Sequence, residues 1–258
     1  MAKQYMVGLL CLGLMGSCFL IKCESSEPVG SLNNNENQTV QKNYNYIASI
    51  ENFNEAYNAY ISARVADKNI DVNEEYAIAI DRISKVVTID RENADAWLLG
   101  AQIYRARGGL SYAKNYFSHA IAAYEKKLIE NIHDPKAKLK YAIACYASDE
   151  RYISSYDDYT LSAYIAASEA LKLIAVKDEK NMLPSYDLDK LIAHIILHDD
   201  KVEDCLQMLK ERHDKNSLEY KLASDVYEGM VKQGKWFWMV NSRENAEKEF
   251  LLYCLFNK

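Results

Sequence analysis

Apolar residues recur every three or four positions through most of the chain, which is the period of an α-helix. The clearest segment, residues 94–127, has the sequence ADAWLLGAQIYRARGGLSYAKNYFSHAIAAYEKK. Gly108 and Gly109 interrupt its pattern, and glycines in such a position commonly end a helix. The segment therefore predicts one helix over about 94–107 and a second over about 110–127.

The same period continues on both sides of this segment. The further helices that it predicts cover residues 52–66, 188–198, 202–212, 217–232 and 243–256. Residues 31–258 contain five glycines and two prolines, which are too few for the tight turns of an all-β protein. Pattern and composition together predict an all-α domain over residues 46–258.

Residues 94–127 resemble the tetratricopeptide repeat, a helix–turn–helix unit of 34 residues. With Trp97 at the fourth position of that repeat, the small and aromatic positions that follow are filled by Ala101, Tyr104, Ala113, Phe117 and Ala120. Gly100 stands where the repeat usually has Leu, and Glu125 where it usually has Pro. The resemblance implies a right-handed solenoid of antiparallel helix pairs, in which the small residues let paired helices approach closely.

Neighbouring segments fit the repeat more loosely. Its small and apolar positions are matched before the best segment by Ala79, Ile83 and Val86, and after it by Ala142, Cys145, Ala163, Ala167 and Ala170. Helices after Lys177 follow from periodicity alone. The resemblance therefore covers about 75–175 by motif and 50–258 by architecture, with extra terminal helices at the end.

The N-terminus has the charge order of a secretory signal, since Lys3 precedes an uncharged apolar run. Within that run, LMGSC at 14–18 resembles a bacterial lipobox, in which the cysteine becomes lipidated. This predicts a lipoprotein signal peptide over 1–17 and lipidation of Cys18. Two alternatives remain open: ordinary cleavage near Ser25, and an uncleaved apolar anchor.

The segment after the apolar run is polar, rich in Asn and Ser, and without periodicity. Such a sequence buries too little apolar area to offset its chain entropy. It predicts a flexible tether over 18–45. An exported, membrane-anchored protein is expected, with its domain in the periplasm or at the cell surface.

The charge of the chain bears on its partners. Lys3 and Lys22 are the charged residues of positions 1–23, so the rest has 29 basic and 37 acidic residues and a net charge of −8. Phosphate backbones repel such a surface, and nucleic acid is not expected as a partner.

Residue types that could support chemistry are few. His194 and His198 stand four residues apart on one predicted helix, a spacing that can serve zinc, but Ile195 replaces the glutamate of the HExxH motif. Cys145 and Cys205 lie in separate apolar stretches, as does Cys254, which is typical of buried thiols. No catalytic motif occurs in the sequence, so an enzyme, a metal site and a cofactor are not expected.

The resemblance implies a scaffold that binds a protein or peptide in a concave groove lined by the first helix of each pair. The groove positions that it assigns are Asp95, Leu98, Gln102, Arg105, Lys136, Leu139, Ile143 and Tyr146. Gln102 and Arg105 are expected to be exposed, so that replacing them leaves the fold intact. Trp236 and Trp238 form a second candidate anchor, since Trp is frequent in binding hot spots, although they can equally plug the last repeat.

A second function stays open beside the first. The tether and irregular repeats are similar to the repeat lipoproteins of tripartite ATP-independent periplasmic (TRAP-type) transporters, which form oligomers and deliver a small ligand. A symmetric homo-oligomer that retains a ligand would favour this function, whereas an empty monomer would favour a peptide-binding scaffold.

Overall fold

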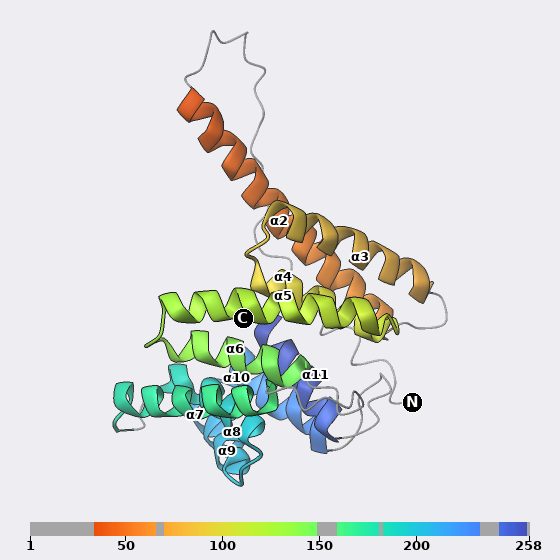
Figure 1. Ribbon diagram of the computed structural model, residues 1–258. Helices are drawn as coiled ribbons and strands as arrows, with labels where there is room; N and C mark the ends of the chain where they lie inside the picture. The colour runs from red at the N-terminus through yellow and green to blue at the C-terminus, as the bar shows by residue number, and fades with distance from the viewer. Residues whose placement is uncertain (1–33, 66–69, 149–158, 181–182, 233–242, 257–258) are drawn as a thin grey trace. The chain divides into compact units, whose positions relative to one another are not determined.

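A computed structural model describes residues 34–65, 70–148, 159–180, 183–232 and 243–256 of the chain. Across these residues every regular element is a helix, which confirms the all-α prediction. The chain divides into two units, residues 1–43 and 44–258, and the second contains α2 (Asn34–Val65) from Tyr44 onward and all the later helices. Figure 1 gives their labels.

The elements follow one another with short connections. Their bounds are α2 Asn34–Val65, α3 Val72–Ile89, α4 Ala94–Ala106, α5 Leu110–Glu130, α6 Pro135–Ser148, α7 Tyr159–Lys177, η1 Pro184–Tyr186, α8 Asp187–Leu197, α9 Val202–Arg212, α10 Leu218–Lys221, η2 Leu222–Lys232 and α11 Arg243–Phe256. The segment η2 is π-helical. The predicted bounds of α9 and α11 are confirmed to the residue, and those of α4, α5 and α8 within a few positions.

Helix ends follow local chemistry. The carboxylate of Asp71 accepts hydrogen bonds from the Asn73 and Glu74 amides and caps α3, and the Asn93 side chain caps α4 through the Ala96 amide. Gly108 ends α4 in the left-handed conformation with φ of 86°, which glycine adopts without strain. These signals explain why the glycine pair predicts the turn between α4 and α5.

One helix extends further than its sequence indicated. Helix α2 begins at Asn34, inside the segment that was expected to be a tether. Adding residues to an existing helix avoids the cost of nucleation. The apolar second half of α2 therefore lets the polar first half continue as a helix.

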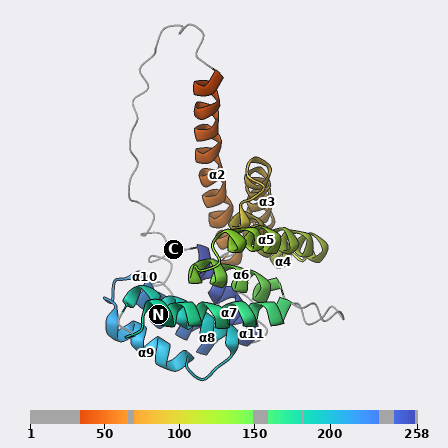
Figure 2. The ribbon, with the colours of Figure 1, turned by 60° about the vertical axis from the view of Figure 1, so that its left-hand side comes forward.

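Within residues 44–258 the helices pack in chain order. Figures 1 and 2 show α2 and α3, then α4 and α5, then α6 and α7, then α8 and α9 following one another through this unit. Contacts join α3 to α4, α4 to α5, and so on to α9, while α11 packs against η2 and returns to α6. Each helix is thus covered mainly by its neighbours in sequence.

Two apolar clusters form the core. The first joins α2, α3 and one face of α4, and the second runs from the other face of α4 through α5–α9 to α11. Trp97 and Phe256 are partly buried and pack against both clusters. The predicted small positions Ala101, Ala113 and Ala120 are fully buried, whereas Trp97 is only half-buried.

Gly100 makes room for an aromatic ring. A methyl group at this position would overlap the ring of Tyr116 on α5. That ring lies between Trp97 and Tyr104, with centroids 4.9 and 5.0 Å away, so it has little freedom to move. This contact explains why glycine stands where the tetratricopeptide repeat usually has Leu.

Gly100→Ala should therefore lower the free energy of unfolding by ~1–3 kcal/mol, the usual cost of overpacking. Urea denaturation measures the change. Gly229→Ala is the control, because nothing lies within 4 Å of a methyl group built there. It should stabilise by up to about 1 kcal/mol. Equal effects of the two substitutions would contradict the packing of Tyr116 on Gly100.

Candidate functional site

Helix α11 contains a run of charged residues where its surroundings are apolar. Glu247, Lys248 and Glu249 lie next to Phe250 and Leu251, which are completely buried. Glu247 is 5 % exposed and Lys248 is 4 % exposed. Burying charge is costly unless each group meets a partner, so the contacts of these three residues define the most unusual site among the described helices.

Glu249 meets two arginines from helices far away in sequence. Its Oε1 lies 3.6 Å from Nη2 of Arg64 on α2 and 3.7 Å from Nη2 of Arg105 on α4. The hydroxyl of Tyr60, also on α2, donates to Oε2 at 3.4 Å. The side chains of Arg64, Arg105 and Glu249 are 17 %, 20 % and 18 % exposed, so solvent screens the three charges only partly.

Arg105 is held by several further groups. It donates through Nη1 to the carbonyl oxygen of Ala147 at 2.8 Å and through Nη2 to Oε1 of Gln102 at 2.5 Å. Its guanidinium also lies 5.5 Å from the ring centroid of Phe117, within the range of a cation–π contact. These contacts fix the guanidinium in the orientation in which it faces Glu249.

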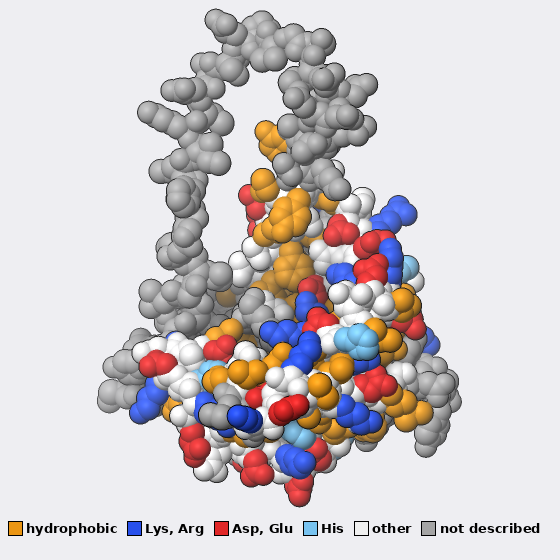
Figure 3. Space-filling model, turned by 90° about the vertical axis from the view of Figure 1, so that its left-hand side faces the viewer, with side chains coloured by type: hydrophobic (Ala, Val, Ile, Leu, Met, Phe, Trp, Pro, Cys, Tyr) orange, Lys and Arg blue, Asp and Glu red, His pale blue; other side chains and the backbone are white. Residues whose placement is uncertain are grey.

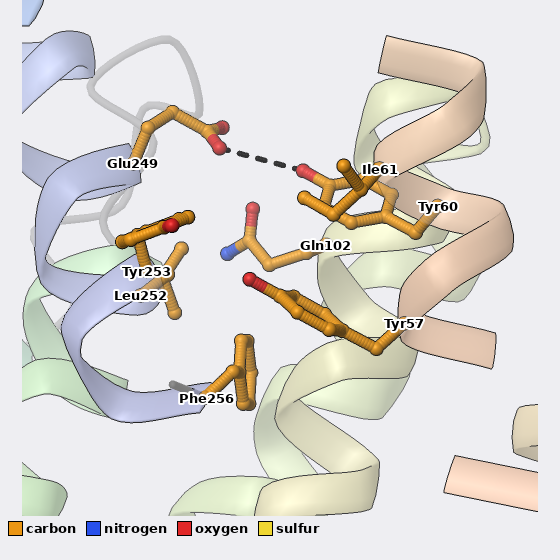
Figure 4. Close-up of a pocket in the computed structure, with 8 residues that line it drawn as sticks. All are labelled: Tyr57, Tyr60, Ile61, Gln102, Glu249, Leu252, Tyr253 and Phe256. Carbon is orange, nitrogen blue, oxygen red and sulfur yellow. Dashed lines mark hydrogen bonds between the residues drawn. The ribbon is translucent and has the colours of Figure 1, made fainter. Parts of the chain in front are cut away.

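A small pocket lies beside this cluster, between α2, α4 and α11 (Figure 4). Its lining consists of Tyr57, Tyr60, Ile61, Gln102, Glu249, Leu252, Tyr253 and Phe256. Its enclosed volume is about 20 Å³, which holds about one water molecule. Small-molecule sites are usually larger by more than tenfold. This pocket is therefore a packing gap under α11 rather than a ligand cavity.

The side chain of Gln102 lines this gap, and its amide nitrogen donates to no other protein group. Gln102 is 1 % exposed, and its Nε2 has no hydrogen-bond partner. In Figure 4 the amide nitrogen lies on the side of Leu252 and Tyr253 of α11. The gap that Gln102 lines has room for about one water molecule, which can accept this hydrogen bond.

The surroundings of Tyr60 change the pKa of its hydroxyl. Burial, reinforced by the negative charge of Glu249, raises the pKa of Tyr60 well above its ordinary value. The hydroxyl therefore keeps its proton at neutral pH. It remains the donor to the carboxylate.

The other charges of α11 meet α6 and α8. The ammonium group of Lys248 lies 5.4 Å from the ring centroid of Tyr146, and Glu247 lies 3.7 Å from Nδ1 of His198. The Tyr146 hydroxyl and Nε2 of His198 are 3.0 Å apart, which links α6 to α8. Helix α11 thus touches α2, α4, α6 and α8 through polar side chains.

These contacts revise the predicted groove. Leu98, Gln102, Leu139, Ile143 and Tyr146 are buried, and Arg105 is mostly buried, so the expectation that Gln102 and Arg105 are exposed was wrong. The reason is that α11 and neighbouring helices cover this side of α4 and α6. Replacing Gln102 and Arg105 together would disturb the core.

Two predicted positions remain accessible at least in part. Lys136 is exposed, and Asp95 is half-buried, where it accepts hydrogen bonds from the Tyr124 hydroxyl and from Lys140. These contacts within the fold account for the conformation of the Asp95 side chain, so no partner protein is needed to explain it. Cys18, Trp236 and Trp238 lie outside the described residues.

The histidine pair does not converge on one point. Nδ1 of His194 lies 2.6 Å from Asp199, whereas Nε2 of His198 faces Tyr146. His198 ends α8 in the left-handed conformation, which turns its ring away from the helix face that it would share with His194. Within the described residues, no group of three or more His, Cys, Asp or Glu side chains could hold a metal ion.

The thiols are buried as their apolar context predicted. Cys145, Cys205 and Cys254 are buried and form no disulfide bond with one another. Burial raises the pKa of Cys145 to about 12 and that of Cys205 to about 11. Both thiols are therefore protonated and poorly nucleophilic at neutral pH.

The sequence pattern gave no direct indication of the Glu249 cluster. A usable signal was present, because three consecutive charged residues at 247–249 stand directly before the apolar run 250–256 in one predicted helix. Among the described helices, none is long and apolar enough to cross a membrane. Comparison with models of known protein families, with curated proteins and with solved structures found no match.

Proposed function

We propose that this protein is a non-enzymatic helical-repeat scaffold, similar to tetratricopeptide proteins, that binds a helical segment of a partner protein. The observation that supports this most is the position of α11. It lies against α2, α4, α6 and α8, the first helices of successive pairs, which form the side that a repeat protein uses for binding. This side of the domain accepts an α-helix as its occupant.

The order of packing supports the repeat arrangement. Consecutive helices contact one another from α3 to α11, which is how a solenoid builds a continuous core. The buried alanines at the predicted small positions fit the same arrangement. We infer antiparallel helix pairs in a right-handed stack, with α10, η2 and α11 as the additional C-terminal elements.

A protein partner fits the site better than a small ligand. The gap beside Glu249 holds about one water molecule, whereas the surface around it is long enough for a helix to contact four others. Helix-in-groove recognition uses such a surface, with apolar anchors on one face of the incoming helix.

Anchoring is part of the proposal. We infer that Cys18 is lipidated and that the domain works at a membrane surface in the periplasm or outside the cell. Residues 18–33 and the start of α2 would then separate the domain from the lipid.

Both parts are tested with one tagged chain expressed in its native host. Wild type should be in the membrane fraction, incorporate labelled palmitate and crosslink to a discrete protein partner. Cys18→Ala should lose the label and leave the membrane fraction. A wild-type chain that incorporates no palmitate would contradict anchoring, and one that crosslinks to no protein at native abundance would contradict the scaffold function.

A further inference from the structure

We infer that the surface of α2 and α4 around Arg64 and Arg105 is a helix-binding site that α11 holds closed, and that its external ligand is an amphipathic helix with a carboxylate followed by apolar side chains three and seven residues later. This rests on the proposed scaffold function and specifies the chemistry of the partner.

The spacing comes from α11 itself. Glu249, Leu252 and Phe256 lie at positions i, i+3 and i+7, which form one face of a helix. All three line the pocket between α2, α4 and α11. Phe256 contacts the rings of Phe53 and Tyr57 on α2, with centroids 6.0 and 5.8 Å apart. The face that α11 presents is thus one acidic group followed by two apolar anchors.

The receiving surface selects for the acidic group. Arg64 and Arg105 place two guanidinium groups around one carboxylate, and Tyr60 donates to the same carboxylate. A helix with a neutral residue at this position would leave two mostly buried cations without their anion. The planar guanidinium group also matches the geometry of a carboxylate.

Two features distinguish α11 from an ordinary core helix. Its charges at 247–249 are buried, and the hydration that they would regain if the helix left offsets part of the loss of their contacts. Its packing also leaves a gap of about one water molecule beside Gln102.

Other exposed apolar side chains give no comparable indication of a ligand. Figure 3 shows hydrophobic side chains along the upper helical column of the face in view. The exposed residues of α2 in this unit include Tyr44, Tyr46, Ile47 and Ile50. No charged group fixes what would cover them. The surface around Arg64 and Arg105 differs because its present occupant specifies both charge and spacing.

The test uses a fluorescent peptide with the sequence of residues 243–258 and Cys254→Ser, titrated with full-length chains. In wild type, α11 competes at an effective concentration of roughly millimolar, so the peptide should bind weakly. Phe256→Ala in the chain removes two ring contacts of α11 and should tighten peptide binding at least about tenfold. Ile129→Ala, an exposed apolar change on α5, is the matched control and should bind the peptide as wild type does.

Peptide variants test the chemistry. With the Phe256→Ala chain, a peptide with Glu249→Gln should bind at least about tenfold more weakly, as expected for the loss of a charge-assisted contact. A peptide with Leu252→Gln should also bind more weakly, because it loses the apolar anchor three residues after the carboxylate. Circular dichroism and melting curves establish that each chain is folded.

If a folded Phe256→Ala chain binds no peptide, or binds all peptides equally, the inference is wrong. Leu252→Ala in the full chain provides a second opened form should Phe256→Ala fail to fold. Partner capture at the membrane without peptide binding would contradict this site and leave the scaffold function standing. Peptide binding without partner capture would support the site and contradict the scaffold function.

Discussion

Glu249→Gln is expected to lower the free energy of unfolding by about 3 kcal/mol or more, because it leaves Arg64 and Arg105 mostly buried without their anion. The substitution keeps the size of the side chain, so the loss comes from charge rather than from packing. Tyr60 also loses its charged acceptor. Urea denaturation followed by circular dichroism measures the change.

Glu130→Gln is the matched control for this prediction. Glu130 is exposed at the end of α5, where solvent screens its charge, and the substitution should change stability by less than ~0.5 kcal/mol. If the two variants unfold at the same urea concentration, α11 is not held by the two arginines.

Raising the pH from about 9 to about 11 is expected to lower the free energy of unfolding by roughly 4 kcal/mol through Cys145 and Cys205 alone. Burial holds the pKa of these thiols at about 12 and about 11, against a value near 9.0 in the unfolded chain. Above pH 9 the unfolded state loses these protons while the native state keeps them. The stability that the two thiols contribute is therefore fully present below the pKa of the unfolded chain. It is lost as the pH rises toward the pKa values of the native protein.

Tyrosines extend the same trend above pH 10. Burial raises the pKa of Tyr60 and Tyr124 well above 10.0, and that of Tyr141 to about 12. These tyrosines also lower the free energy of unfolding as the pH rises, because burial favours the neutral phenol in the native state. Chemical denaturation at pH 8, 9, 10 and 11 measures the whole profile.

The substitutions Cys145→Ala and Cys205→Ala separate the contribution of the thiols to this pH profile from that of the tyrosines. Each substitution should make the loss between about pH 9 and pH 11 smaller by roughly 2 kcal/mol. An unchanged profile in the double variant would show that neither thiol has the raised pKa that its burial implies.

Much of the helix layout could be predicted because its determinants are local. The start of α4 at the Asn93 cap and its end at Gly108 depend on side chains within a few residues. The bounds of α9 follow from the period of its apolar residues, Val202, Cys205, Leu206 and Leu209, which are all buried. Such features need no knowledge of distant contacts.

The position of α11 could not be predicted in this way. Periodicity gives its bounds, but its contacts join residues as far apart as Tyr60 and Glu249, which are separated by 189 positions. Tetratricopeptide resemblance assigned Gln102 and Arg105 to an open groove, and nothing local indicates that a C-terminal helix covers them. The need for glycine at position 100 could not be predicted either, because it arises from the ring of Tyr116 on the next helix.

A double-mutant cycle between Arg105→Gln and Glu249→Gln tests most directly whether α11 is held in this groove by charge. The coupling energy between the two substitutions, from urea denaturation of the four chains, should be about 1–3 kcal/mol, as for residues in one ion-pair network. The Glu130→Gln substitution should show no coupling to Arg105→Gln. Effects of Arg105→Gln and Glu249→Gln that add within about 0.5 kcal/mol would contradict the contact, and with it the position of α11 against α4.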